Sequence, residues 1–370
     1  MKHNYPDSRS DLFAGFIERV MTMVVSQGYM AQVTMQSWMF LSSYEKLRLQ
    51  LRHQASIVTL LHMDNMVMRI AFGTSATVWK IGIGGQLAGK YTWITLDDLN
   101  EGRPRRFPPR NARNATAGAD GHFTLTQADF DTIPGFPIVY WLTEKVLHVF
   151  RGMDTLGMHS RAAKGLVTAD NATFVRCWWE VSRDKTGFDY ASREEARSSK
   201  KRWFPYANGG LFRKWAGNVD SVVDWEDDGR RLQTTLTTDG CRIRATNFNL
   251  NRIFLPAIVW TVVTSGEQSF RVAPRGSLFD AAAGMCQSNK EEILLAVLNS
   301  RVAALMLSAL NPTLNLHPGY LEAVPIPANV SAVPVEPVKC LVKLSENDWN
   351  SRETSWEFTK NPLVALTEQK

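Results

Sequence analysis

Apolar and polar positions in the first hundred residues follow the helical and strand periods in turn. After Ser10-Asp11, apolar residues recur every four positions and predict a helix with one buried face that ends before Gly28; they are Leu12, Phe16, Val20 and Val24, with Phe13 and Ile17 beside them. Runs rich in β-branched and aromatic residues predict strands over 29–35, 57–61, 70–81 and 90–95, with a charged helix over 43–54. This alternation predicts a doubly wound α/β sheet of which one βαβαβ half is visible.

The pattern changes after residue 96, and the change indicates several domains. Arg, Pro, Asn and Gly dominate 97–122, which we interpret as a linker or long loop, and the glycines of 82–89 predict a hairpin turn before it. Short strands and a helix over 290–310 make 123–327 an α+β body. The prolines after Pro325 predict an extended or disordered tail over 328–370. The fold class expected is therefore α/β plus α+β.

Composition and charge narrow the class of partner. The 370 residues are 44% hydrophobic with a net charge of +6, and Arg clusters lie within 103–113 and 193–214. Such clusters favour a polyanionic partner, although the first is equally explained as a solvated basic face. No apolar leader or membrane-length run occurs, so we expect a cytoplasmic protein without a membrane partner. The four cysteines are widely spaced and predict neither a disulfide framework nor a metal site.

Cations and aromatic rings alternate over residues 200–215, a pattern typical of nucleic-acid binding. Lysine and arginine side chains can neutralise phosphates, and flat rings can stack on bases or pack beneath the cations. The residues expected to contact DNA here are Lys200, Lys201, Arg202, Trp203, Arg213 and Lys214. Phosphate contacts of this kind position a duplex without specifying its sequence. The alternative is that Trp203, Phe204 and Trp215 form a small core.

Five separated blocks, in this order, resemble the PglX family. These proteins are adenine-specific DNA methyltransferases of BREX phage-defence systems and are similar to fused type IIG restriction-modification methyltransferases. The blocks lie at Asn4–Phe13, Val33–Leu41, Asp170–Glu180, Lys201–Tyr206 and Asn311–Asn315. The resemblance covers almost the whole chain up to Pro327. It implies transfer of a methyl group from S-adenosylmethionine to adenine N6 in double-stranded DNA, after the base has been flipped out.

Two motifs on which this chemistry depends in the family do not occur in the sequence. They are the Gly-containing cofactor loop and Asn-Pro-Pro-Tyr; the Pro-Pro pair present is Pro108-Pro109, which follows Phe107. We therefore expect the chain to begin just after the catalytic loop of a family-length protein. It would then hold the second half of a Rossmann-like methyltransferase sheet (1–96), followed by a target-recognition domain (123–327). Such a half-sheet would leave an exposed edge and an uncovered apolar face.

The resemblance also implies roles for individual residues. Asp11 and Phe13 fall where the family lines the pocket for the cofactor's adenine, although Asp11 is equally a first-turn helix acid. Phe72 falls where related enzymes stack a ring on the flipped base, and the alternative is a core residue on a strand. Asn171 and Arg176 fall in the target-recognition region, where amide and guanidinium groups can contact base edges. Residues 170–171 also suit an ordinary turn.

These expectations support one interpretation of the chain's function and leave two alternatives open. The chain is expected to bind DNA and to be inactive alone, because it lacks the cofactor loop and the catalytic motif. Its partners would be the missing N-terminal methyltransferase half or other defence-system proteins. The alternatives are a non-enzymatic DNA-recognition or partner-docking subunit, and an inactive gene remnant. His62 and Asp64 could suggest a metal site, but no third ligand follows at a usable spacing, and a hydrogen-bonded histidine near a strand end is the better interpretation.

Overall fold

The computed structural model describes residues 3–100, 103–104, 122–311 and 313–367. The residues 105–121, which make up most of the expected linker, and Pro312 lie outside the described part. The chain divides into two compact units, the first made of Met1–Met153 with Ser308–Thr313, the second of Asp154–Leu307 with Leu314–Lys370. The first unit thus includes 123–153, which we had placed in the target-recognition domain. The reason is that β7 (His122–Leu125) pairs with β4 (Gly89–Ile94) at the edge of the first sheet.

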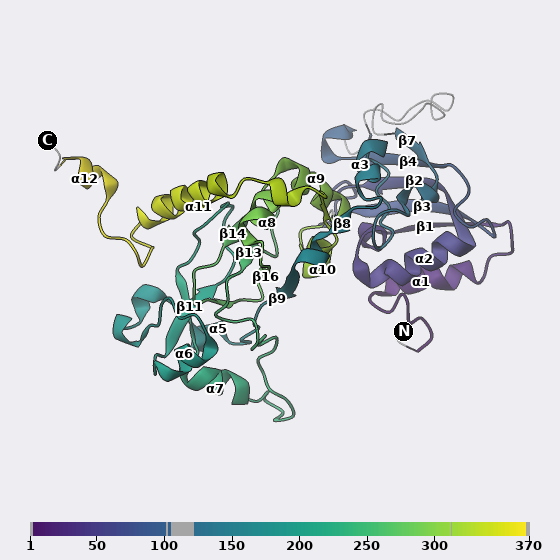
Figure 1. Ribbon diagram of the computed structural model, residues 1–370. Helices are drawn as coiled ribbons and strands as arrows, with labels where there is room; N and C mark the ends of the chain where they lie inside the picture. Colours follow the sequence, from purple (N-terminus) through teal and green to yellow (C-terminus); the bar gives the residue numbers. More distant parts are fainter. Residues whose placement is uncertain (1–2, 101–102, 105–121, 312, 368–370) are drawn as a thin grey trace. The chain divides into compact units, whose positions relative to one another are not determined.

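The first unit is built on a five-stranded mixed sheet with strand order β1-β3-β2-β4-β7. Figure 1 shows these strands side by side in that order. Strand β3 is antiparallel to both neighbours and β2 is parallel to β4, so β1, β2 and β4 run in the same direction. The strands not yet bounded are β1 (Tyr29–Met35), β2 (Ala55–Met63) and β3 (Thr74–Ile81). The mixed α/β character expected from the sequence is confirmed.

The hairpin expected at 82–89 is wrong, because the chain crosses over the sheet instead of turning back. Strand β4 does not pair with β3 but lies beyond β2, parallel to it. The connecting glycines allow this crossing: Gly82 N donates to Gln54 O (2.7 Å), and Gly85 N donates to Ala55 O (3.2 Å). A side chain at Gly89 would place its Cβ 2.5 Å from the Ile57 carbonyl oxygen. The glycines therefore serve close backbone approach at the amino end of β2.

Two helices pack on one side of this sheet, α1 (Leu12–Met21) and α2 (Glu45–Gln54) (Figure 1). Helix α1 does not bury the stripe that its sequence predicts. Leu12 and Phe16 are 61% and 56% exposed, whereas Ala14 and Ile17 are fully buried. The four-residue repeat does not identify the buried face of α1, because apolar residues occupy nearly every face of this helix.

Short elements complete the first unit. The 3-10 turns η1 (Gln36–Met39) and η2 (Ser42–Tyr44) lead from β1 into α2, and β5 (Leu99–Asn100) pairs antiparallel with β6 (Arg103–Pro104). The remaining elements are η3 (Leu96–Asp98), η5 (Gln127–Phe130) and α3 (Glu144–Val149).

The second unit contains two four-stranded sheets and several short helices. One sheet has the order β10-β12-β11-β15 and the other β14-β13-β16-β9. The strands are β9 (Arg161–Lys164), β10 (Val175–Cys177), β11 (Trp203–Ala207), β12 (Ser221–Asp224), β13 (Ile258–Thr261), β14 (Phe270–Val272), β15 (Leu278–Phe279) and β16 (Ala283–Gln287). Phe204, Tyr206, Trp225 and Phe254 form part of a buried cluster against the first of these sheets.

The helices of the second unit lie at the ends and sides of these sheets. They are α4 (Leu156–His159), α5 (Asn171–Phe174), α6 (Arg193–Ser198), α7 (Glu226–Thr234), α8 (Glu291–Leu298), α9 (Arg301–Leu310) and α10 (Pro318–Glu322). The last residues of α9, from Ser308, are assigned to the first unit. Short turns η6 (Trp178–Glu180), η7 (Arg183–Lys185) and η8 (Val330–Ala332) accompany them, as does the pair β8 (Asp154–Thr155) and β17 (Pro325–Ile326).

The segment 328–370 differs from the extended tail that its prolines predict. It contains α11 (Val335–Asn350), a helix of 16 residues, and α12 (Pro362–Thr367). Pro334 precedes α11 and Pro337 lies in its first turn, where no backbone hydrogen bond is lost. Val338 and Trp349 are buried along it, so α11 packs on the second unit through an apolar face.

The helix expected over 290–310 is two helices. α8 and α9 meet at Asn299 and Ser300 with a bend of 74°. Within the described residues no single helix is long and apolar enough to span a membrane, and this bent pair passes the same test by length and composition only.

Candidate functional sites

The carboxyl ends of β1, β2 and β4 meet at one edge of the first sheet, which is where α/β proteins place their ligand sites. Tyr44, in the turn that follows β1, packs its ring 5.6 Å from that of Phe13 near the start of α1. The predicted cofactor residues therefore lie at this edge. Asp11 is exposed and precedes α1 without making a side-chain capping hydrogen bond. Burial, and then the nearby Asp11 carboxylate, raise the pKa of Tyr44.

Phe72 lies in the loop between β2 and β3 and belongs to the same edge. It is 47% exposed and precedes β3, which begins at Thr74, so it is not the core strand residue of the alternative interpretation. The backbone N–H of Gln36, directly after β1, donates to the Gly73 carbonyl (3.0 Å). A Cβ on Gly73 would fall 2.3 Å from Gln36 Oε1, so a side chain at this position would displace the Gln36 side-chain amide. The loop end that carries Phe72 is thus tied to the carboxyl end of β1.

His62 stands behind this loop in a buried polar network that sequence reasoning did not assign to the site. Its Nδ1 lies 2.9 Å from the Tyr140 hydroxyl, and its Nε2 is hydrogen-bonded to Gln36 Oε1. The imidazole stacks on Trp93, with ring centroids 5.1 Å apart. Burial lowers the pKa of His62 to about 4, so the ring is neutral at physiological pH. The hydrogen-bonded histidine of the sequence interpretation is therefore present, and its partner Gln36 links it to Gly73.

The described residues contain no group of three or more metal-ligating side chains. Asp64, two residues after His62, accepts a hydrogen bond from Trp93 Nε1 (2.9 Å). Burial raises the pKa of its carboxyl group.

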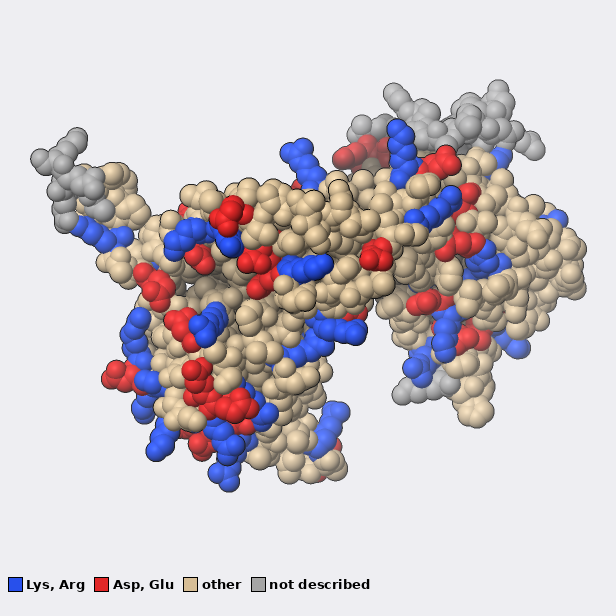
Figure 2. Space-filling view, in the orientation of Figure 1, with Lys and Arg blue, Asp and Glu red and all other residues tan. Residues whose placement is uncertain are grey.

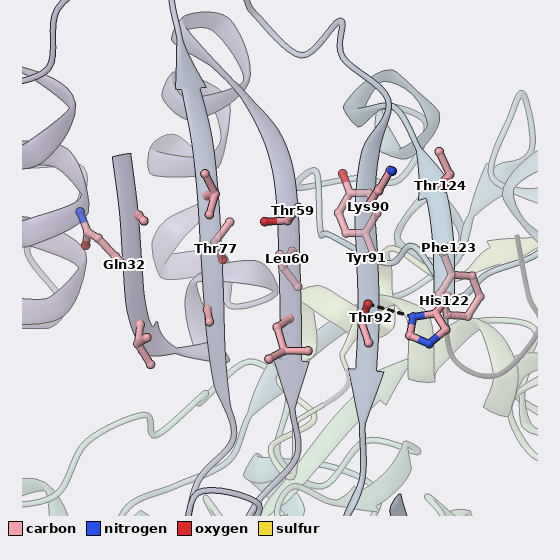
Figure 3. Close-up of a pocket in the computed structure, with 15 residues that line it drawn as sticks. Gln32, Thr59, Leu60, Thr77, Lys90, Tyr91, Thr92, His122, Phe123 and Thr124 are labelled. Carbon is pink, nitrogen blue, oxygen red and sulfur yellow. Dashed lines mark hydrogen bonds between the residues drawn. The ribbon is translucent and has the colours of Figure 1, made fainter. Parts of the chain in front are cut away.

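The other face of the first sheet carries a hollow of about 430 Å³. Gln32 Nε2 donates to the Phe16 carbonyl on α1 (3.4 Å), so the alternate residues Ala31 and Val33 face the opposite side. Two rows of paired residues cross the five strands there and are drawn with their neighbours in Figure 3. They are Val33, Ala76, Leu61, Thr92 and His122, and Ala31, Val78, Thr59, Lys90 and Thr124. The face is apolar over β1 and β3 and polar over β4 and β7.

The basic and aromatic block of the second unit is partly interior. Trp203 and Phe204 are 8% and 1% exposed in β11, so these two rings belong to the core, as the alternative interpretation held. The Arg202 guanidinium lies 5.1 Å over the Trp203 ring and pairs with Asp224 (2.9 Å). Trp203 therefore packs beneath a cation. Lys200 is exposed, and the half-buried Lys201 donates to the Asp184 carbonyl.

The remaining predicted cations of this block are already engaged. Arg213 pairs with Asp348 (2.8 Å) and lies 5.3 Å over the Trp349 ring of α11. The hydrogen bond from Arg213 lowers the pKa of Asp348. Lys214 Nζ donates to the Asn299 carbonyl (2.9 Å). Lys and Arg side chains also surround α6 and α7, interspersed with carboxylates (Figure 2).

The predicted base-reading residues lie around α5. Asp170 caps this short helix by accepting from Thr173 N (3.2 Å), so the ordinary turn expected as an alternative is present. Asn171 is exposed, and its Oδ1 accepts from the Thr168 hydroxyl. Arg176, on β10, donates to the Val175 carbonyl (2.6 Å) and to the Ala172 carbonyl. The side chain of Asn171 is exposed, so its amide nitrogen can reach a ligand.

Two curated proteins share sequence with nearly the whole chain. The adenine-specific methyltransferase PglX of Lacticaseibacillus casei (strain Zhang) is 33% identical over 373 residues, covering 97% of this chain and 30% of PglX. The adenine-specific methyltransferase BrxX of Escherichia coli O9:H4 (strain HS) is 35% identical over 372 residues, covering 98% of this chain and 29% of BrxX. The chain spans about 30% of the length of these relatives. No protein-family model matches it.

Solved structures of restriction-modification enzymes show a weaker likeness. The type IIL enzyme MmeI in complex with DNA gives a TM-score of 0.48 at 10% identity, over 95% of this chain and 46% of MmeI. The DrdV–DNA complex gives 0.46 at 10% identity, over 93% of this chain and 41% of that chain. The sequence identities confirm the resemblance found in the blocks of the sequence: this chain is homologous to a segment of the PglX and BrxX adenine-specific methyltransferases.

Proposed function

We propose that this chain is the DNA-binding part of an adenine-specific DNA methyltransferase of the phage-defence and restriction-modification type. The observation that carries the proposal is the identity of 33% and 35% with two adenine-specific methyltransferases along almost the entire chain. The first unit would supply the second half of the Rossmann-like catalytic sheet, and the second unit would supply target recognition. The proposed location is the cytoplasm, where such a protein meets DNA.

The topology of the first unit supports the catalytic half-sheet. Strands β1 and β2 run in the same direction, each follows a helix, and the antiparallel β3 lies between them. The predicted residues Asp11, Phe13 and Phe72 come from separate segments that reach the carboxyl edge of these strands. In a Rossmann-like sheet this edge binds the ligand. Phe72 would stack on the flipped adenine, and the hydrogen-bonded pair Gln36 and His62 would hold the loop that carries it.

The residues at this edge fit one wall of a pocket for S-adenosylmethionine. The free carboxylate of Asp11 suits an amino or hydroxyl group, and the half-buried ring of Phe13 suits the flat adenine. S-adenosylmethionine would supply the methyl group. The other walls would come from the part of the methyltransferase that the matched segment does not include.

Apolar surfaces of the first unit support assembly with that part. Among the described residues β1 has no strand on its outer edge, Val33 is 62% exposed, and the hollow continues across β3. On α1, Leu12 and Phe16 are exposed as well. These surfaces favour the docking of a further methyltransferase segment. For this reason we prefer a part of an enzyme to a gene remnant.

The test is a pair of measurements on the chain alone with unmethylated duplex DNA. We expect DNA affinity that falls steeply with salt, because phosphate contacts dominate it. With tritiated S-adenosylmethionine we expect no label in the DNA, since the sequence contains no Asn-Pro-Pro-Tyr. Absence of DNA binding at low salt would refute the DNA-binding role, and methyl transfer by the chain alone would refute the need for a further segment.

A further inference from the structure

The connection between β11 and β12 is a loop with an unusual backbone. Gly209, Gly210 and Gly217 have φ values of 88°, 113° and 105°, and Trp215 and Asn218 also have positive φ. Left-handed backbone is unfavourable for tryptophan, so the surrounding contacts must impose it. Residues 208–218, which include these positions, are called the 208–218 loop below.

Side-chain donors hold three successive carbonyl groups of the 208–218 loop. Arg271 Nη2 donates to the carbonyl of Gly209, and Thr261 Oγ1 donates to that of Gly210 (2.9 Å). Asn218 Nδ2 donates to the carbonyl of Leu211 (2.6 Å). Two of these donors come from β13 and β14 and the third from the loop itself, so hydrogen bonds hold the tip in the observed conformation.

The base of the loop is fastened to β14 and to α11. Trp215 N donates to Phe270 O, and Val272 N donates to Trp215 O, both at 2.9 Å. Ser345 of α11 donates its hydroxyl hydrogen to the loop, with Oγ 3.0 Å from Lys214 O and 2.8 Å from Ala216 O.

Arg271 holds the tip at a cost in stability. It is 1% exposed, no described carboxylate forms an ion pair with it, and its Nη1 has no hydrogen-bond partner among the described residues. Burial, and then Arg213, lower its pKa to about 10. A buried cation without a counter-ion is unfavourable. Arg271 nevertheless holds the Gly209 carbonyl in place.

The fixed tip presents two large apolar side chains to water. Leu211 is 86% exposed and Phe212 is 58% exposed. The ammonium group of Lys214 lies 5.9 Å from the centre of the Phe212 ring. An apolar anchor on a preorganised loop loses little conformational entropy on binding.

The shape and charge of the tip favour DNA as its ligand. A protein interface of standard size buries about 800 Å² on each partner, far more than two side chains offer. Leucine and phenylalanine are among the wedges that proteins insert between base steps from the minor groove, with cations beside them for the phosphates. We propose that Leu211 and Phe212 form a wedge that partly unstacks a base step of duplex DNA, and that the Lys214 ammonium, which keeps its hydrogen bond to the Asn299 carbonyl, adds positive charge beside the wedge. The inference rests on the proposed DNA-binding function.

The test compares a tip variant, Leu211→Ser with Phe212→Ser, with a matched control, Leu236→Ser with Ile243→Ser. Leu236 and Ile243 are 52% and 43% exposed on another loop of the same unit. Binding is measured by fluorescence anisotropy with mixed-sequence duplex DNA. Unstacking is measured by relaxing a plasmid with topoisomerase in the presence of saturating protein, because a wedge unwinds DNA and changes the linking number of the product.

We expect the wild-type chain and the control to shift the topoisomer distribution and the tip variant to leave it unshifted. The tip variant should bind about tenfold more weakly, as after loss of an interface anchor, with an unchanged salt dependence. Equal binding and equal topoisomer shifts for the tip variant would overturn the wedge and leave the DNA-binding function standing. Binding without any topoisomer shift by the wild-type chain would do the same. A wild-type chain that binds no DNA would overturn both proposals.

Discussion

At the scale of single residues, burial determines the protonation state of His62. Burial lowers the pKa of His62 from 6.5 to about 4. Between pH 6.5 and about 4, this histidine is therefore protonated in the unfolded chain but neutral in the folded chain. The free energy of unfolding should therefore fall by roughly 3 kcal/mol as the pH drops from about 7 to below 4. Urea denaturation across this pH range measures the effect.

A His62→Gln variant separates this contribution from those of other titrating groups. It should be less stable at pH 7 but lack the part of the slope between pH 6.5 and 4. The exposed His53→Gln variant serves as the control and should keep the wild-type slope. If His62→Gln follows the wild-type pH dependence, the ring is not buried in its neutral form.

The cations of the 200–215 block divide into free and engaged groups, and variants should show the difference. Replacing the exposed Lys200 with glutamine should lower the slope of log affinity against log salt by roughly 1, because one phosphate contact is lost. Arg202→Gln should instead lower the free energy of unfolding by about 1–3 kcal/mol, since Asp224 is buried and accepts from Arg202. Salt titrations of DNA binding, together with denaturation curves, measure both. An unchanged salt slope for the Lys200 variant would exclude this lysine from the interface.

At this scale the sequence predicts which residues carry charge but not which are available. Arg213 and Lys214 stand in a basic run, yet Asp348 and Asn299, far along the chain, engage them. Trp203 looks like a stacking ring and is 8% exposed. Such partners are set by tertiary contacts, which a local pattern does not contain.

At the scale of elements, α2 depends on one buried arginine. Arg48, 3% exposed, donates to the carbonyls of Trp38 and Leu41 in the turns after β1 and to that of Gly135. An Arg48→Lys variant keeps the charge but loses the planar set of donors. We expect it to lower the free energy of unfolding by at least about 2 kcal/mol, measured by thermal and urea denaturation. The control is Arg19→Lys on the outer face of α1, which should change stability little.

The open face of the first sheet allows a second prediction at this scale. Val33→Glu should leave the stability of the chain within about 0.5 kcal/mol of wild type, because the side chain is 62% exposed. In a chimera where this chain replaces the matched segment of E. coli BrxX, the same variant should abolish methylation by blocking the docking of the other methyltransferase segment. Leu344→Glu, 64% exposed on α11, is the control. Full methylation by the Val33→Glu chimera would show that this face stays uncovered.

Strand β1 was predicted with its observed bounds because a short apolar run lies between glycine and polar residues. The inner face of α1 was not, since apolar residues surround it. The glycine segment 82–89 was predicted as a hairpin although it carries the chain across β2. A run of glycines indicates flexibility and close approach, and the direction of the chain afterwards depends on packing.

For the whole molecule, the family could be inferred from the sequence because five separated blocks keep their residues and order. The division between the two units could not, because 123–153 joins the first sheet by pairing of β7 with β4. Long-range pairing of this kind leaves no local signal at residue 123.

The central claim is that this chain carries target recognition and half of the catalytic sheet. The direct test is the BrxX chimera, expressed in a host without other adenine methyltransferases, with the methylated adenines located by sequencing. A chimera that carries the matched segment of the L. casei PglX is the control. The account predicts adenine methylation at a sequence different from that of the parent enzyme. Methylation at the parent's own sequence, or a folded chimera that methylates nothing, would contradict it.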